Sequence, residues 1–145
     1  NLGNVIVPCV TAGVNTHDSI LFPSSFKKLT DTACRLRWSL KDIPLTLDSG
    51  FDSVENAGLI RGIGMTPVIK PNLRNTKDKK IIRKRMRLFI KHERVYKLRH
   101  SVERGFAWED KYRKLVIRYE RLEATFKGFR YLAATLINFR SRFGR

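Results

Sequence analysis

Two acidic side chains stand out in this strongly basic chain because the pattern around each predicts an ordered position. Asp48 comes directly after residues 45–47, a short apolar stretch that predicts a strand, and Gly50 predicts a turn just beyond it. In open α/β sheets, ligands and chemistry gather at the carboxyl ends of strands. Glu103 lies much further along the chain, near the start of a predicted helix. Asp48 and Glu103 are therefore the candidate catalytic residues.

Paired carboxylates of this kind are suited to binding divalent cations. In two-metal phosphoryl transfer, carboxylates hold two cations about 3.5–4 Å apart, where one activates the attacking oxygen and the other stabilises the leaving oxygen. Magnesium keeps several waters, so two or three carboxylates suffice. Asp48 and Glu103 could meet over the edge of a sheet as such ligands. The alternative for Glu103 is a first-turn glutamate, which the helix dipole stabilises by less than about 1 kcal/mol.

Two further aspartates occupy positions typical of helix starts. Asp52 precedes Glu55 by three residues, which is the spacing of a capping box, so we assign Asp52 to helix initiation. Asp18 follows a cluster of turn-forming residues, and its setting favours an N-cap. The alternative is that Asp18 serves as a further metal-binding carboxylate. Cys9 and Cys34 lie far apart with no nearby His or Cys cluster, so neither a zinc site nor a disulfide framework is predicted.

The elements that must position these residues follow from the apolar pattern and the turn formers. We predict strands at 4–11, 45–47 and 66–69, and helices at 19–21, 25–36, 53–62, 78–92 and 120–139, with a further helix that starts near Glu103. Pro23 separates the first two helices, and Gly62 and Gly64 end the third. The two later strands with the helix between them predict a right-handed βαβ unit, with parallel strands buried on both faces.

The length of 145 residues is that of one domain. Within it we distinguish a sheet-forming part at 1–70 that carries Asp48, a basic helical segment at 71–99, and C-terminal helices at 100–145 that carry Glu103. No apolar run reaches the roughly 18 residues that a membrane span needs. No signal peptide is recognisable, so we expect an intracellular protein, in the cytoplasm or nucleoid, without a membrane partner.

The charge is distributed very unevenly along the chain. The net charge is +17; residues 1–70 contribute +1 and residues 71–145 contribute +16. Such a field favours a polyanion, nucleic acid first and an acidic membrane surface second. We predict a DNA-binding face on the helix at 78–92, against the alternative of an ordinary solvated face. Its candidate phosphate contacts are Arg83, Lys84, Arg85 and Arg87.

Several blocks resemble a known family. The block Asp48-Ser49-Gly50-Phe51-Asp52-Ser53 resembles the Asp-x-Gly-Tyr/Phe-Asp-Ser block of DDE-type insertion-sequence transposases. The block Tyr96-x-x-Arg99-x-x-x-Glu103-Arg104, followed by Phe106-Ala107-Trp108, is similar to their Tyr, Arg, Glu signature. Further matches are Asn15-x-His17-Asp18-Ser19, Arg118-Tyr119-Glu120-Arg121-Leu122 and Phe126-x-Gly128-Phe129.

The resemblance implies a ribonuclease H-like mixed sheet flanked by helices, with a long C-terminal helix. It implies an Asp, Asp and Glu set that holds two Mg or Mn ions for strand cleavage and transfer at transposon ends. By position, Asp48 matches the second Asp and Glu103 the Glu, while Tyr96 and Arg99 match the signature. Transposon-end and target DNA are the implied partners, and a homodimer is possible. Arg104 and Lys111 are further implied DNA contacts, although the signature's Lys falls on Asp110, one place before Lys111.

The match leaves one carboxylate unaccounted for. The family's first Asp should lie on a strand before Asn1, so we expect the chain to be a fragment or a decayed copy. With two carboxylates for two cations, we expect it to be catalytically inactive alone and poorly stable. The competing hypothesis is a basic nucleic-acid-binding module in which Asp48 and Glu103 serve turns and caps. A third is a ribosome-associated protein, which would prefer RNA to DNA.

Overall fold

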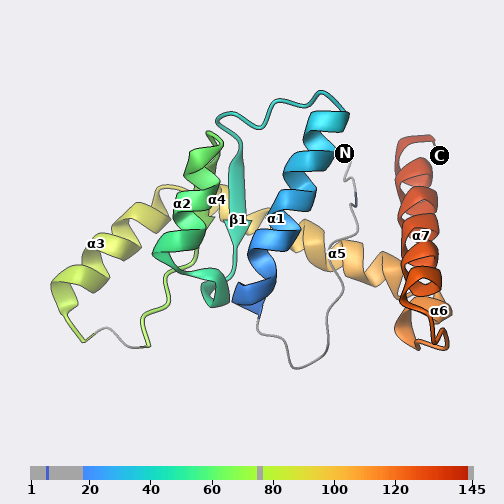
Figure 1. The fold of residues 1–145 in the computed structure, drawn as a ribbon. Helices are drawn as coiled ribbons and strands as arrows, with labels where there is room; N and C mark the ends of the chain where they lie inside the picture. Colours follow the sequence, from blue (N-terminus) through green and yellow to red (C-terminus); the bar gives the residue numbers. More distant parts are fainter. Residues whose placement is uncertain (1–5, 7–17, 75–76, 144–145) are drawn as a thin grey trace. The chain divides into compact units, whose positions relative to one another are not determined.

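The computed structural model describes Ile6 and residues 18–74 and 77–143, in two compact units that are each described by themselves. The strand predicted at 4–11 lies outside the described residues except for Ile6. The unit of residues 9–98 holds α1 (Asp18–Arg35), β1 (Pro44–Leu47), the short 3-10 helix η1 (Ser49–Phe51), α2 (Val54–Gly62), β2 (Thr66–Ile69), α3 (Lys79–Ile90) and α4 (Glu93–Lys97). The unit formed by 1–8 and 99–145 holds α5 (His100–Glu109), α6 (Arg113–Val116) and α7 (Glu123–Phe143) (Figure 1).

The βαβ unit predicted from the sequence is present. β1 and β2 pair in parallel, from Pro44 opposite Thr66 to Leu47 opposite Ile69, with α2 between them in the chain. The prediction that both strands are buried on both faces is wrong, because Val68 is the only buried strand residue in the described sheet. A sheet of two strands leaves an open edge on each, so the neighbouring side chains stay partly exposed.

The core of the 9–98 unit joins α1 to the βαβ unit. Phe22 and Phe26 of α1 stack at 5.3 Å between ring centroids and pack with Ile60 and Met65. Leu45, Leu47 and Ile69 of the strands pack against the same cluster. α1 runs unbroken through Pro23, so the predicted division into two helices is wrong. Proline removes one helical hydrogen bond, and burial of the adjacent phenylalanines on one face offsets that loss.

The start of α2 differs from the predicted capping box. Ser53 is the N-cap, and its Oγ accepts a hydrogen bond from Asn56 N at 3.0 Å. The assignment of Asp52 to helix initiation is therefore wrong, by one residue. The buried Asn56 also donates from Nδ2 to Phe51 O at 3.0 Å, which ties α2 to η1. α2 ends at Gly62 as predicted, and Gly64 turns the chain with a φ of 81°.

The basic helix α3 forms close to the predicted bounds. Asp78 caps it, with Oδ1 accepting from Lys80 N at 2.7 Å. Ile82, Met86 and Phe89 are half-buried on one side, as the spacing predicts, whereas Ile90 is exposed. α3 is therefore an amphipathic helix whose apolar side is attached to the rest of the unit.

The described residues of the other unit form helices joined by turns and irregular segments. Ala133, Ala134 and Ile137 of α7 are buried, and Glu109 Oε2 lies 3.7 Å from a guanidinium nitrogen of Arg130, which links α5 to α7. α7 starts and ends a few residues later than the predicted 120–139, so that Leu122 precedes it and is 71% exposed. No helix in the described parts of the chain combines the length and the apolar character that a membrane span requires. The described fold is thus mixed α/β and mostly helical, with a two-stranded parallel sheet and a long C-terminal helix.

Candidate active site

Asp48 occupies the position that the sequence predicts, at the carboxyl end of β1. It follows Leu47, the last paired residue of the strand, and its side chain is exposed. Its backbone oxygen accepts a hydrogen bond from Phe51 N at 3.0 Å, which closes η1. Phe51 also packs against the core. The turn that carries Asp48 is therefore held by the paired strand before it and by Phe51 after it.

Tyr96 contacts Asp48 directly. The Tyr96 hydroxyl donates a hydrogen bond to Asp48 Oδ1 at 3.0 Å. α4 packs against β1, and the ring of Phe89 meets the Tyr96 ring edge-on at 4.8 Å between centroids. The structure therefore brings together two site residues that the sequence places 48 positions apart, and an aromatic contact holds the tyrosine in place.

Asp52 has a different set of partners that sequence reasoning missed. Its Oδ2 accepts from Asn72 N at 2.6 Å and pairs with the guanidinium of Arg85, which also donates to Asn72 O at 3.4 Å. Asp52 thereby joins the loop after β1, the segment after β2 and α3. One signal in the sequence could have indicated this. Arg85 lies three residues from Ile82 on the half-buried side of α3, where a charged group needs a partner.

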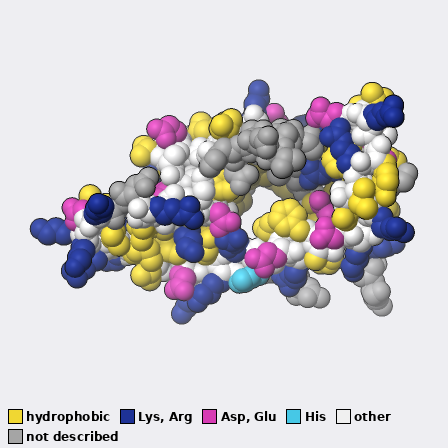
Figure 2. All heavy atoms as spheres, turned by 90° about the horizontal axis from the view of Figure 1, so that it is seen from below, with side chains coloured by type: hydrophobic (Ala, Val, Ile, Leu, Met, Phe, Trp, Pro, Cys, Tyr) yellow, Lys and Arg dark blue, Asp and Glu magenta, His cyan; other side chains and the backbone are white. Residues whose placement is uncertain are grey.

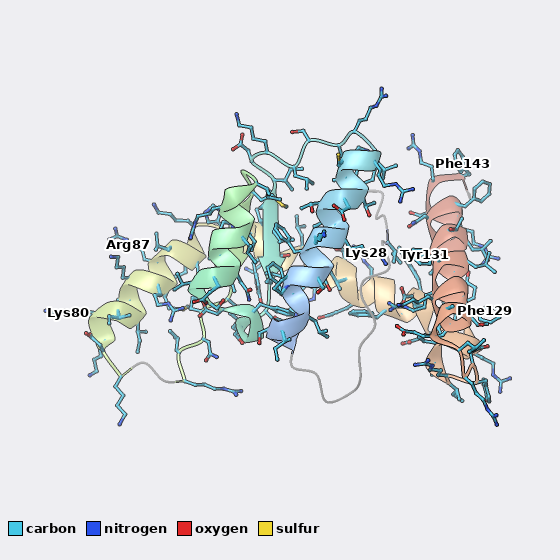
Figure 3. All side chains as sticks on the ribbon, in the orientation of Figure 1. Lys28, Lys80, Arg87, Phe129, Tyr131 and Phe143 are labelled. Atoms are coloured by element: carbon cyan, nitrogen blue, oxygen red, sulfur yellow. The ribbon has the colours of Figure 1, made fainter. Side chains whose placement is uncertain are left out.

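The other predicted phosphate contacts of α3 are at the surface. Arg83, Lys84 and Arg87 are exposed, while Arg85 is half-buried in its ion pair. In the space-filling view, Lys and Arg side chains gather around the α3 end of its unit (Figure 2). Lys80 and Arg87 extend outward from the helix (Figure 3). Six of the twelve residues of α3 are Lys or Arg, so the helix presents a concentrated positive surface.

Glu103 lies in the first turn of α5, in the unit that does not contain Asp48. Its side chain is 63% exposed, and Oε2 lies 3.3 Å from Nδ1 of His100. Arg99 immediately precedes α5 and is half-buried, whereas Arg104 is exposed. This setting matches the alternative of a first-turn glutamate, so metal binding by Glu103 stays a prediction. Lys111 follows α5 and lines a hollow beside α7.

Of the two aspartates in the block 48–53, Asp48 fits a divalent cation better. Its carboxylate is exposed at a strand end and supplies the oxygen donors that magnesium prefers. Asp52 fits less well, because its carboxylate already receives Arg85 and a backbone N–H. Across the residues that the structure describes, no three His, Cys, Asp or Glu side chains gather as a metal-binding group.

Comparison with known proteins identifies the family of this chain. The model of the family described as Transposase DDE domain matches residues 45–140, about two-thirds of the chain. The chain belongs to this transposase family. The match to the transposase DDE domain starts within β1 and includes Asp48, Tyr96, Arg99 and Glu103. No curated protein and no solved structure matches the chain.

Proposed function

We propose that this chain is part of a DNA transposase whose parent activity is metal-dependent cleavage and strand transfer at transposon ends. The observation that supports this most directly is the hydrogen bond from Tyr96 to Asp48 at the end of β1, inside the region that the transposase family matches. Asp48 and Tyr96 belong to separate blocks of the family resemblance, and their side chains are in contact. A binding module without an active site gives no reason for that contact.

In this proposal Asp48 and Glu103 are the metal ligands, with Mg or Mn as the cations. Divalent cations, when bound, would activate the attacking oxygen and stabilise the leaving oxygen. Tyr96 orients the Asp48 carboxylate, and Arg99 and Arg104 neutralise nearby phosphate. The exposed cations of α3 follow the DNA backbone and set the position of the strand without reading its sequence.

The parent fold that suits these roles is a ribonuclease H-like domain, of which β1, α2 and β2 form part. In such a domain, Asp48 and Glu103 would meet at one sheet edge. Residues 1–145 would then form a single partial catalytic domain. Transposon-end and target DNA are the proposed partners, within the cytoplasm or nucleoid, and a homodimer is compatible with the family.

Catalysis by this chain alone is not expected. Residues 1–145 contain counterparts of the family's second Asp and its Glu, but we recognise no counterpart of the first Asp. Two carboxylates holding two cations leave one ligand fewer than the family uses. We therefore propose weak metal binding and no strand cleavage by residues 1–145.

A titration calorimetry experiment with Mn²⁺ tests the metal ligands. Wild type is expected to bind measurably, and the variant that combines Asp48→Asn with Glu103→Gln is expected to lose that binding. Asp31→Asn on α1 is the matched control, because Asp31 is also an exposed carboxylate and lies away from β1 in sequence. Circular dichroism verifies that each variant is folded. Equal and negligible binding by folded wild type and double variant would overturn the proposal.

The second candidate function is a basic nucleic-acid-binding module without catalysis. The observation that favours it is the exposed, first-turn position of Glu103 beside His100, which a helix start explains without any metal. The same titration separates the two candidates, because the module predicts no specific Mn²⁺ response. Competition between DNA and RNA of equal length then separates a DNA module from a ribosome-associated protein, for which RNA should bind more tightly.

A further inference from the structure

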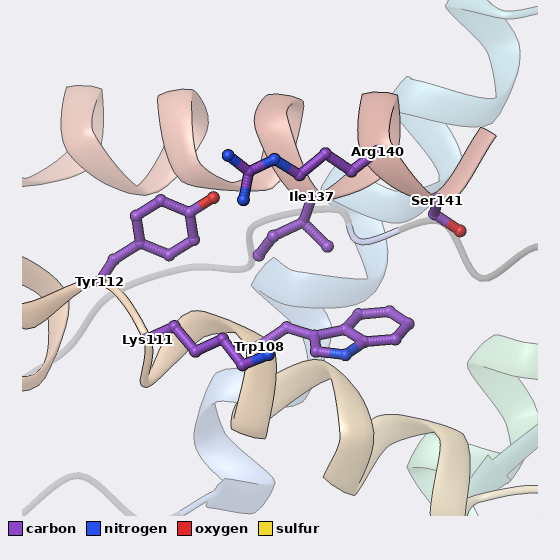
Figure 4. Close-up of a pocket in the computed structure, with 6 residues that line it drawn as sticks. All are labelled: Trp108, Lys111, Tyr112, Ile137, Arg140 and Ser141. Carbon is purple, nitrogen blue, oxygen red and sulfur yellow. The ribbon is translucent and has the colours of Figure 1, made fainter. Parts of the chain in front are cut away.

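A hollow of about 390 Å³ lies between the end of α5 and the C-terminal half of α7, within the 99–145 unit. It is lined by Trp108, Lys111, Tyr112, Ile137, Arg140 and Ser141 (Figure 4). The volume falls in the range of about 300–1,000 Å³ that is typical of small-molecule sites. The candidate active site uses only Lys111 from this set, so the hollow needs a separate explanation.

One side of the hollow is apolar and flat. The Trp108 indole lies across it from the buried Ile137 of α7, and the Tyr112 ring closes one end (Figure 4). Trp108 and Tyr112 are both half-buried, so part of each side chain remains accessible to a ligand. A planar aromatic surface of this kind suits another planar ring, and base–aromatic stacking contributes about 1–3 kcal/mol per base.

The rim of the hollow is positively charged. Lys111 and Arg140 are both exposed, and within the described residues neither makes an ion pair. The nearby Glu109 does not neutralise them through a close contact, because it pairs with Arg130. The hydroxyl groups of Tyr112 and Ser141 add hydrogen-bonding capacity at the two ends (Figure 4). The rim therefore suits an anion, and a phosphate above all.

We propose that this hollow binds one unstacked nucleotide of single-stranded DNA, with its base against Trp108 and its phosphate between Lys111 and Arg140. A free phosphate would leave the aromatic side unused, and a duplex keeps its bases stacked out of reach. The inference rests on the proposed function in one respect, namely that the ligand is DNA. The inference also gives Lys111 a role in binding phosphate, although Lys111 falls one place after the position of the family's Lys.

Intrinsic fluorescence provides a direct test, because the chain contains only two tryptophans, Trp38 and Trp108. Trp38→Phe leaves Trp108 as the single reporter. A short oligothymidylate is expected to quench its fluorescence, whereas an oligomer of abasic sites with the same number of phosphates is expected to quench it far less. Equal quenching by the two oligomers would overturn the proposal, because it would show that the base contributes nothing.

Affinity for the same oligothymidylate is then compared among charge-matched variants. Arg140→Gln is expected to weaken binding about fivefold or more, corresponding to roughly 1 kcal/mol. Arg142→Gln removes the same charge from the same helix, but Arg142 does not line the hollow, so a smaller loss is expected. Both positions are exposed, so neither change should unfold the chain. Equal losses in the two variants would reject a dedicated nucleotide site.

The two proposals fail in different ways. If the Mn²⁺ response of Asp48 and Glu103 is absent while Trp108 is quenched selectively by the base-containing oligomer, the catalytic proposal fails and the nucleotide site stands. If the Mn²⁺ response is present while Arg140→Gln behaves as Arg142→Gln does, the nucleotide site fails and the catalytic proposal stands.

Discussion

At the scale of single residues, Asp48 and Asp52 belong to one sequence block but have different surroundings. Asp48 receives the Tyr96 hydroxyl, a donor that orients a carboxylate without adding a charge. Asp52 is 15% exposed and receives the Arg85 guanidinium together with a backbone N–H. A carboxylate that is held by a guanidinium in this way has less capacity for a cation. Asp52 therefore supports the architecture around Asp48, which supports the proposal that Asp48 is the ligand.

The contact with Tyr96 should affect metal affinity more than stability. Tyr96→Phe removes the hydroxyl and keeps the ring that packs against Phe89. Because a single hydrogen bond contributes about 0.5–1.5 kcal/mol, Mn²⁺ affinity measured by calorimetry should fall by up to about tenfold. The free energy of unfolding should change little, since Asp48 is exposed. Tyr119→Phe is the control at an exposed tyrosine. An unaltered Mn²⁺ affinity in Tyr96→Phe would contradict an orienting role.

Changes to the Asp52–Arg85 pair, in contrast, should lower the stability of the fold. Asp52→Asn weakens an ion pair that joins three segments, so urea denaturation should show a loss of about 1–2 kcal/mol. Arg85→Gln should produce a similar loss. The double variant should lose less than the sum of the two, because both changes remove the same interaction. Additive losses would show that the pair does not act as one structural contact.

At the scale of elements, the βαβ unit depends on α2 lying against the strands. Ile60 of α2 is completely buried in the cluster with Phe22, Phe26 and Met65. Ile60→Ala should therefore lower the free energy of unfolding by about 2–5 kcal/mol. Val54→Ala, at an 83% exposed position of the same helix, should have an effect below about 0.5 kcal/mol. Comparable effects in urea unfolding would mean that α2 is not packed as described.

α3 should determine how strongly DNA binding depends on salt. Replacing Arg83, Lys84 and Arg87 with Gln should reduce the slope of log affinity against log salt by about 0.9 for each phosphate that the variant no longer neutralises. Fluorescence anisotropy with duplex DNA measures this slope. A control variant carries glutamine at Lys27, Arg35 and Lys41, three exposed cations outside α3. If the control lowers the slope equally, binding follows net charge alone and the α3 face has no special role.

The elements were predictable where the deciding interactions are local. The strand at 66–69, the helix near 53–62 and the helix near 78–92 follow from short apolar patterns and glycine positions, and the structure confirms them with small shifts. The break at Pro23 and the capping role of Asp52 were wrong. Burial of Phe22 and Phe26 decides the first, and the Ser53 hydroxyl decides the second. Sequence rules for helix breaks and helix caps do not show which of these competing interactions decides the structure.

The candidate site was predictable only in part, for the same reason. The position of Asp48 follows from its strand, but no spacing rule relates it to Tyr96 or relates Asp52 to Asn72 and Arg85. Those contacts form between segments tens of residues apart, and tertiary packing alone brings them together. The family resemblance marked Tyr96 as a site residue without indicating what it touches.

At the scale of the whole molecule, the proposed function requires residues from both units to bind the same cations. Asp48 belongs to the 9–98 unit and Glu103 to the 99–145 unit. Both units carry part of the positive charge, because residues 71–145, which include parts of both units, carry +16 of the net +17. The proposal therefore requires one carboxylate from each unit, and the cations of both units would attract DNA phosphates.

A thermodynamic cycle on Mn²⁺ affinity tests whether the two carboxylates act together. If Asp48 and Glu103 ligate the same cations, Asp48→Asn and Glu103→Gln should each remove most of the affinity, and the double variant should lose little more than either single variant. Such non-additivity is the behaviour of groups that share a partner, whereas distant independent sites give additive changes. Additive losses would place the two carboxylates in separate weak sites. A loss confined to Asp48→Asn would leave Glu103 as a helix-start residue, and the proposed ribonuclease H-like arrangement would then have to be given up.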